Sequence, residues 1–355
     1  MHSRRDFGWT DLLGSQHKER VQPWLVVFVV RALEYVERQA MRLHVRVAPP
    51  PLGADDAVFG ESVAKVVGHD AVAGVFISDS PRLWNDTLLT LAKWVPRYPE
   101  IPFTIAATNF VMRHWAVVRN SADILADASN AEFRVGVARG DSAVRDVGLK
   151  PQPISEFINS FEQFVGAAGE DHRATPTLIA TNGPKLMRYA GGHADGVIVQ
   201  IGVEEGIVKE AVDHIRAGAE EAGRDPSEVS IILSTLFIDP DYDEAVVEQI
   251  MARKYGAISQ RDPQILQKMG IPVLPPLEGY VDLAHTDEDH DLPADPGAVR
   301  EFRERYFIPG APADAAALFR RLEQIGITEA YLMDLGHNAP PDAAIGFIED
   351  MVTAG

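Results

Sequence analysis

The chain has 355 residues, 46% of them hydrophobic, which is enough to bury a large core in one or two domains. Its formal net charge of −19 argues against a nucleic-acid-binding protein, because such proteins present a basic face, and the absence of cysteine excludes disulfides and thiolate metal sites. The only candidate for a targeting or membrane segment is "WLVVFVV" at 24–30. Since a membrane span needs about 20 apolar residues, we expect no membrane segment and a cytoplasmic protein.

Residues 1–40 precede the first predicted strand, so we expect an N-terminal extension with a helical segment and Met41 as an alternative start. Eight short apolar or β-branched runs then predict strands. These runs are 42–47, 74–79, 103–108, 133–138, 177–181, 196–201, 229–238 and 330–335. Helical patterns separate them, and the pattern at 204–223 ends on Gly223, a residue type typical of the position just after a helix.

Most of these runs are continuously apolar, as expected for parallel strands that are buried on both faces. Eight strands that alternate with helices predict an α/β fold, a TIM-like (β/α)8 barrel. The alternative, an open doubly wound sheet, would normally carry a glycine-rich turn after its first strand, where this chain has "APPPLGADD". We therefore expect a single barrel domain over 41–355.

Two connections are longer than a plain barrel requires, so insertions are predicted after strands 4 and 7, within 139–176 and at 239–310. The second insertion contains "HTDEDHD" at 285–291, in which histidine and aspartate recur at intervals typical of metal ligands. The residues concerned are His285, Asp287, Asp289 and His290. Because no regular element is predicted there, we expect a solvated acidic loop and no metal site.

The stretch "GVARGDSAVRDVGL" at 136–149 leaves the fourth predicted strand at the end where a (β/α)8 barrel carries its active site. Its glycines let the backbone approach a ligand closely, and Arg139 and Asp141 would lie at the barrel mouth. From these residues alone, a glycine turn with a surface salt bridge is an open alternative. His44, within the first strand, either reaches the substrate or is a core histidine with satisfied hydrogen bonds.

The same stretch, read as "VGVARGDSAVRDVGLKPQP", resembles the fourth-strand motif of the luciferase-like superfamily, in the branch similar to methylenetetrahydromethanopterin reductase. Three further pieces match this superfamily in order: "GVFISDSPRLWND", "FTIAATNFVMRHWAVV" and "PTLIATNGPKLMRYAGGHADGVIV", the last followed by "GRDPSEV". Together the pieces cover about residues 42–238. The resemblance implies a TIM-like barrel that binds FMN or the deazaflavin coenzyme F-420.

The resemblance also implies which residues hold the coenzyme. A bulge of the third strand would support the flavin ring through a cis peptide bond between Ala106 and Ala107, and the turn at Asn182 would bind the coenzyme phosphate at a helix N-terminus. The coenzyme-binding residues it implies are Ala106, Ala107, Thr108, Asn109, Ala138, Arg139, Gly140, Asn182, Gly183 and Gln200. Basic side chains that could assist the phosphate in an acidic protein are Arg113, Arg139, Lys185 and Arg188.

Two carboxylates are predicted to be catalytic. Asp141 occupies the position of an acid in some relatives, with capping of the following helix as the alternative role. Asp79 would contact the flavin or the substrate, or else cap the next turn. The neighbouring Ser80 stands where many deazaflavin enzymes have histidine, so no role of that histidine carries over.

The resemblance implies an oxidoreductase that transfers hydride between coenzyme F-420 and an unidentified small organic substrate. An FMN-dependent monooxygenase of the same fold is the first alternative, and a non-catalytic flavin-binding relative is the second. We further expect a homo-oligomer, a dimer, with no nucleic-acid or membrane partner.

Overall fold

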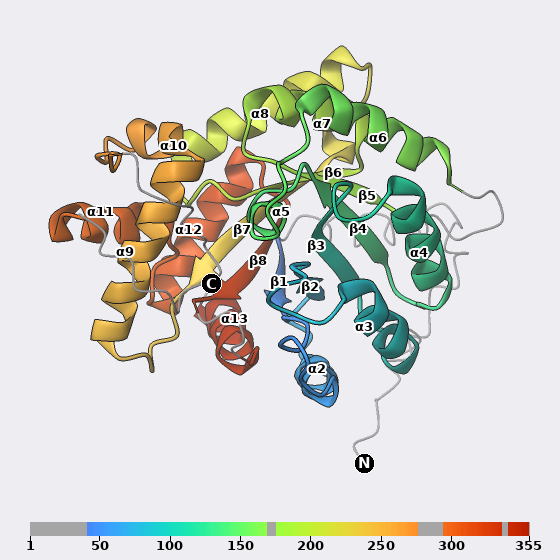
Figure 1. Ribbon diagram of the computed structural model, residues 1–355. Coiled ribbons are helices and arrows are strands. Elements are labelled where there is room, and N and C mark those ends of the chain that lie inside the picture. Colours follow the sequence, from blue (N-terminus) through green and yellow to red (C-terminus); the bar gives the residue numbers. More distant parts are fainter. Residues whose placement is uncertain (1–40, 169–174, 276–293, 336–339, 355) are drawn as a thin grey trace, which may run out of the picture. The chain divides into compact units, whose positions relative to one another are not determined.

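A computed structural model of the protein describes residues 41–168, 175–275, 294–335 and 340–354. Within these ranges eight parallel strands close into a barrel in the order β1 to β8, and β8 pairs with β1 (Figure 1). The predicted TIM-like (β/α)8 fold is therefore confirmed. Residues 1–40 and the stretch at 285–291 lie outside the described residues.

Each predicted run overlaps one strand, and the ends of run and strand differ by at most two residues. Their bounds are β1 (Arg42–Arg46), β2 (Val75–Ile77), β3 (Phe103–Asn109), β4 (Phe133–Ala138), β5 (Thr177–Ala180), β6 (Gly196–Val199), β7 (Ser230–Phe237) and β8 (Glu329–Asp334). Every residue of β2 and of β6 is buried, which explains why these strands are apolar on both faces.

Helices cover the outside of the barrel. The helices that follow successive strands are α2 (Ala57–Ala64), α3 (Thr87–Trp94), α4 (Trp115–Asp127), α6 (Ile154–Gly166), α7 (Pro184–His193), α8 (Glu205–Glu221), α12 (Pro312–Ile325) and α13 (Asp342–Ala354), with single 3-10 turns η1 (Val95–Arg97) and η2 (Pro226–Glu228). Helix α8 ends as predicted: Gly223 has φ +72° and donates its N–H to the carbonyl of Glu220, while the N–H of Arg224 reaches the carbonyl of Ala219.

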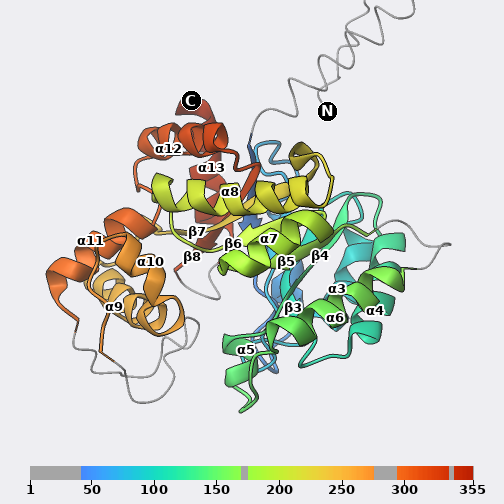
Figure 2. The same cartoon turned by 90° about the horizontal axis from the view of Figure 1, so that it is seen from above.

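Additional helices lie in the two long connections. α5 (Ser142–Arg145) precedes α6, and α9 (Glu244–Arg261), α10 (Pro263–Lys268) and α11 (Pro296–Tyr306) separate β7 from α12. Figure 2 shows the last three together at one side of the barrel, away from α3, α4 and α6. The sequence reading gave no helix in this insertion. α9 forms because Val247, Met251, Tyr255 and Ile258 recur at helical spacing and are buried.

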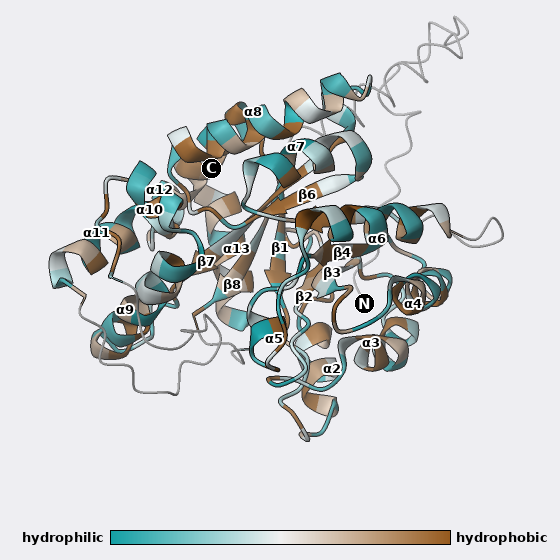
Figure 3. Ribbon diagram, turned by 45° about the horizontal axis from the view of Figure 1, so that its top comes forward, coloured by the Kyte–Doolittle hydropathy of each residue, from teal (hydrophilic) through white to brown (hydrophobic). Residues whose placement is uncertain are grey.

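The barrel interior is filled in layers. A cluster of five buried side chains from β2, β5, β6, β7 and β8 occupies its middle: Phe76, Leu178, Ile198, Ile232 and Tyr331. A larger apolar core lies between the strands and the covering helices, so that the strands are hydrophobic while the helices alternate between hydrophobic and hydrophilic faces (Figure 3). This middle layer supports whatever binds at the ends of the strands.

A charged cluster also lies inside the barrel. Glu329, fully buried, receives two hydrogen bonds of 2.9 Å from the guanidinium of Arg134, and its Oε2 lies 2.8 Å from Nε2 of His44. Burial lowers the pKa of His44 to about 4. Burial alone would raise the pKa of Glu329, but His44 and Arg134 hold it well below its usual range. His44 is thus a core histidine, and it does not line the cavity at the carboxyl ends of the strands.

Candidate active site

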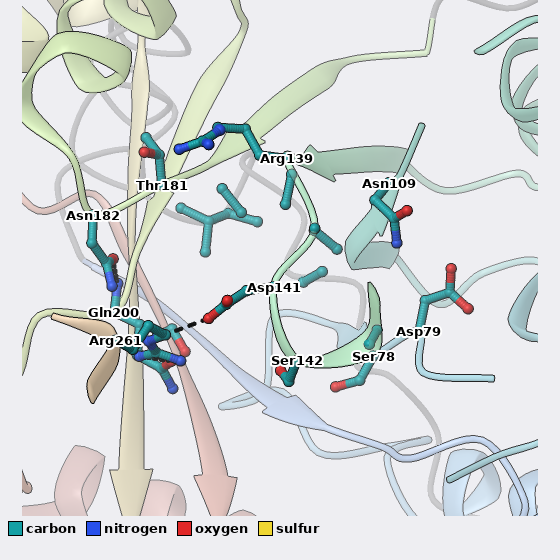
Figure 4. Close-up of a pocket in the computed structure, with 18 of the residues that line it drawn as sticks. Ser78, Asp79, Asn109, Arg139, Asp141, Ser142, Thr181, Asn182, Gln200 and Arg261 are labelled. Carbon is teal, nitrogen blue, oxygen red and sulfur yellow. Dashed lines mark hydrogen bonds and ion pairs between the residues drawn. The ribbon is translucent and has the colours of Figure 1, made fainter. Parts of the chain in front are cut away.

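A cavity of about 760 Å³ opens at the carboxyl ends of the strands, where the eight strands or the loops after them all contribute to its wall. The twelve residues predicted for the site all line it: Asp79, Ala106, Ala107, Thr108, Asn109, Ala138, Arg139, Gly140, Asp141, Asn182, Gly183 and Gln200. Figure 4 shows several of them with their neighbours. Cavities of roughly 300–1,000 Å³ are typical of small-molecule and cofactor sites.

Strand β3 shapes one wall of this cavity. Its register against β4 shifts between Ile105 and Thr108, and the peptide bond between Ala106 and Ala107 is cis, at the position that the sequence predicted. Ala106, Ala138 and Ala180, from three neighbouring strands, all line the cavity. Small side chains at the strand ends leave room for a ligand above the larger side chains of the barrel interior.

Asn109 ends β3 and is almost fully buried. Its Oδ1 accepts hydrogen bonds from the backbone N–H groups of Val111 (3.1 Å) and Met112 (2.8 Å), which fixes the turn after the strand. The amide oxygen is therefore occupied, and the amide nitrogen is the group of Asn109 that a ligand would meet.

Asp79 is buried and is held by a partly buried arginine, Arg113. The guanidinium of Arg113 contacts both oxygens of Asp79 and also donates to Asp86 at 2.7 Å. Burial alone would lower the pKa of Arg113, but Asp79 and Asp86 raise it. A carboxylate paired in this way is better suited to positioning than to proton donation. Arg113 itself does not line the cavity, so it is not part of the predicted phosphate patch.

Asp141 lies on the loop after β4 and points toward Arg261 (Figure 4). Its Oδ1 accepts a hydrogen bond of 2.8 Å from Nε of Arg145, and its Oδ2 lies 4.0 Å from Nε of Arg261. Oδ2 is buried and has no hydrogen-bond partner in the described part of the chain. Asp141 precedes α5, yet its side chain makes no capping hydrogen bond. The alternative role of a side-chain cap is thus absent from this structure.

The turn before α7 is open to the cavity. Gly183 is the N-cap of α7, and its N–H donates to Oγ1 of Thr181 at 3.2 Å. A Cβ at this glycine would meet nothing closer than Thr181 Oγ1, at 3.9 Å. Lys185 lines the cavity. Arg188 does not, because it pairs with Glu221 on the outer surface, so the prediction that Arg188 belongs to the phosphate patch is wrong.

The insertion contributes a polar network that sequence reasoning missed. Asp262 accepts hydrogen bonds from Nδ2 of Asn182 (3.0 Å) and Nε of Arg261 (2.7 Å), and Arg261 also donates to Oε1 of Gln200 (3.1 Å). Burial alone would lower the pKa of Arg261, but Asp262 and Asp141 raise it. The available signal was "QRDP", a basic helix end followed by an aspartate and a proline that can start the next helix.

A second missed residue is Arg46, the last residue of β1, which also lines the cavity. Its Nε donates to Oγ of Ser78 at 2.9 Å, and its Cζ lies 4.9 Å from the centre of the Trp84 ring. Burial lowers the pKa of Arg46 to about 10. The strand period would have revealed it, because side chains two residues apart share a face and His44 points into the barrel.

Among the residues that the structure describes, no group of three or more histidine, aspartate or glutamate side chains is placed to hold a metal ion. Over the same residues, no helix combines the length and the apolar character that a membrane crossing requires.

Comparisons with known proteins agree with this geometry. The 5,10-methylenetetrahydromethanopterin reductase of Methanolobus tindarius is 25% identical over 288 residues, covering 75% of this chain and 87% of that protein. The enzyme of the same name from Methanopyrus kandleri is 27% identical over 207 residues, 56% of this chain and 58% of that protein.

Solved structures share the fold. The coenzyme F-420-dependent tetrahydromethanopterin reductase of Methanopyrus kandleri superposes with a TM-score of 0.66 at 17% identity, covering 88% of this chain and 99% of that one. An F-420-dependent secondary alcohol dehydrogenase superposes with a TM-score of 0.64 at 16% identity, covering 89% of this chain and 99% of that one. The EDTA monooxygenase of Chelativorans sp. BNC1 superposes with a TM-score of 0.56 at 14% identity, covering 88% of this chain and 92% of that one.

The sequence profile described as luciferase-like monooxygenase matches residues 150–329, just over half of the chain. The matched region runs from the loop after β4, through the Asn182 turn and the described part of the insertion, to the first residue of β8. The chain therefore belongs to the luciferase-like monooxygenase family of oxidoreductases.

Proposed function

We propose that this protein transfers hydride between coenzyme F-420 and a small organic substrate. The observation that carries the proposal is that all twelve predicted residues, from segments far apart in the sequence, line one cavity at the carboxyl ends of the strands. Both curated relatives described above are methylenetetrahydromethanopterin reductases, and two of the solved structures are F-420-dependent enzymes. These likenesses support F-420 over FMN.

The residues present fit a phosphate-bearing coenzyme. The turn at Gly183 has open space in front of it and starts a helix, where the helix dipole favours an anion. Lys185, Arg139 and Arg261 line the same cavity and supply positive charge in a chain whose formal net charge is −19. We assign the phosphate to this turn and the ring to the β3 bulge at Ala106 and Ala107.

When bound, the coenzyme supplies the ring carbon that gives or takes the hydride. The chain's own residues orient the reactants and manage the proton. Asp141 is assigned as the proton-handling residue, because Oδ2 is buried at the cavity and free of hydrogen bonds from described residues while Oδ1 is fixed by Arg145. Asp79, clamped by Arg113, is assigned to positioning.

The direct test is a fluorescence titration of the coenzyme-free protein with F-420 and with FMN. We expect saturable binding of F-420. Gly183→Asp places a negative charge at the phosphate turn and should weaken binding by about tenfold or more, because two like charges repel in a partly buried site. Gly206→Asp is the matched control: it adds the same charge at an open position outside the cavity wall and should bind normally.

Unchanged affinity in Gly183→Asp would remove this turn from the site. Binding of FMN alone would favour the second candidate, an FMN-dependent monooxygenase. The matching family profile and the likeness to the EDTA monooxygenase support this candidate. Binding of neither coenzyme by the folded protein would favour a non-catalytic relative.

A further inference from the structure

The cavity has a second cationic region opposite the turn assigned to the phosphate. In a closed barrel of eight strands ordered β1 to β8, β1 lies across from β5. Arg46 ends β1, whereas Thr181, Asn182 and Gly183 follow β5, and both groups line the same cavity. Arg46 is therefore placed to meet the part of the bound molecules that is remote from Gly183.

The guanidinium of Arg46 is fixed in place, but not all of its N–H groups have a hydrogen-bond acceptor among the described residues. Ser78 accepts the hydrogen bond from Nε, and the Trp84 ring lies 4.9 Å from Cζ. The Nη2 group is buried and makes no hydrogen bond to any described residue, and Arg46 as a whole is 9% exposed. A buried N–H group of a cation without an acceptor is costly, so an acceptor is expected at this position.

The neighbouring charged side chains that the structure describes do not supply an acceptor for Nη2 of Arg46, so a ligand has to supply it. Asp334, at the end of β8, attracts Arg46, but its Oδ1 accepts a hydrogen bond from Tyr242 and no hydrogen bond joins it to Nη2. Tyr331, which also lines the cavity, belongs to the apolar layer of the barrel interior, and burial raises the pKa of its phenol, so it carries no charge at neutral pH. Lys254 adds a second cationic side chain to the cavity wall.

We propose that Arg46 recognises an oxyanion, a carboxylate or phosphate group, on the substrate of this enzyme. The proposal rests on the function proposed above, because it takes the Gly183 side of the cavity for the coenzyme. A guanidinium that is held at Nε by Ser78 and lies over an indole has its orientation fixed, and its two Nη groups can donate side by side to two oxygens of a carboxylate or phosphate. The substrate class is then an anionic organic molecule whose reacting atom lies between Arg46 and Asp141.

The test uses the full chain without coenzyme and two probes, sodium acetate and inorganic phosphate, at constant ionic strength. Because Trp84 lies against Arg46, the NMR signal of its indole N–H, assigned with Trp84→Phe, reports on binding there. We expect a saturable shift with one or both probes, and the probe that binds more tightly identifies the oxyanion. Arg46→Gln should weaken that binding about tenfold or more.

Arg82→Gln is the matched control, because it removes the same charge from an arginine that is exposed, lies close to Trp84 in sequence and does not line the cavity. It should leave the titration unchanged. If Arg46→Gln does not fold, Arg46→Lys keeps the charge but lacks the planar fork, and it should still weaken binding severalfold. A shift of equal midpoint in the Arg46 variant and the wild type, or no saturable shift in the wild type, would overturn the proposal.

A coenzyme titration of Arg46→Gln separates this proposal from the function on which it rests. We expect F-420 affinity to be unchanged in this variant. Weakened F-420 binding would reassign Arg46 to the coenzyme and overturn its role toward the substrate. Absence of F-420 binding in the wild type would contradict the proposed function alone, since the oxyanion titration is read without coenzyme.

Discussion

The loop that carries Asp141 depends on Gly140, and replacing this glycine is a quantitative test of how the loop is built. Gly140 has φ +80°, and a Cβ added there would lie 2.3 Å from Cγ2 of Val144, a fully buried side chain. A left-handed backbone costs a non-glycine residue about 1–2 kcal/mol, and forcing an atom into a packed core costs about 1–3 kcal/mol. Gly140→Ala should therefore destabilise the protein by about 2–5 kcal/mol.

Gly148 provides the matched control within the same loop. It has φ +78°, but a Cβ there would meet no atom within 4 Å. Gly148→Ala should therefore show only the backbone cost of about 1–2 kcal/mol. The difference between the two variants isolates the collision with Val144.

Urea unfolding followed by circular dichroism gives both free energies, provided that the unfolding is two-state. Because the collision can be relieved only by moving the loop, Gly140→Ala should also displace Asp141 and reduce turnover, whereas Gly148→Ala should not. Equal loss of stability and of turnover in the two variants would refute the reasoning, since it would mean that the loop moves freely around Gly140.

Three further predictions concern single features. Asp141→Asn should lower turnover by about 10²–10⁴-fold with little change in coenzyme affinity, and near-normal turnover in steady-state assays would dismiss Asp141 as the acid. Because the pKa of His44 falls from 6.5 to about 4 on folding, the unfolded chain binds a proton between these values that the folded chain does not. Stability should therefore fall as the pH drops from 6.5 to 4, by about 3 kcal/mol from this group. In His44→Gln that part of the dependence should vanish in urea unfolding across the same pH window, while the part of the loss below pH 4.5 that Arg134 causes through Glu329 should remain. Identical curves for the variant and the wild type would disprove this role of His44. A chain that starts at Met41 should fold and bind coenzyme, as judged by its yield of soluble protein and the fluorescence titration, and loss of soluble protein would assign residues 1–40 a structural role.

The barrel was predictable because its signals are local. Buried parallel strands must be apolar on both faces, so "GVFISD" and "GVIVQI" are visible as runs, and the spacing between runs reflects one strand and one helix. The helices of the insertion were not predicted, because proline and acidic residues surround them. Two of them do carry the pattern: α11 buries Ala298, Phe302 and Tyr306 at helical spacing, and α9 has a repeating apolar face of its own. That face packs against α11 through Tyr255 and Phe302, whose rings are 5.5 Å apart.

The site was predictable where the chain carries a motif and unpredictable where only the fold brings residues together. Gly140 and Gly183 stand in stretches that resemble a family pattern. Arg261 and Asn182 are 79 positions apart in the chain, yet both bind Asp262 because α9 ends beside the turn after β5. No local pattern in the sequence predicts such a contact.

The filled interior of the barrel restricts how ligands come and go. Phe76, Leu178, Ile198, Ile232 and Tyr331 form a floor, and Glu329, Arg134 and His44 are also packed inside the barrel. Through the described part of the molecule, both reactants must then use the same mouth. Entry and exit of the two reactants are then coupled, because a molecule bound on either side of the cavity narrows the opening through which the other has to pass.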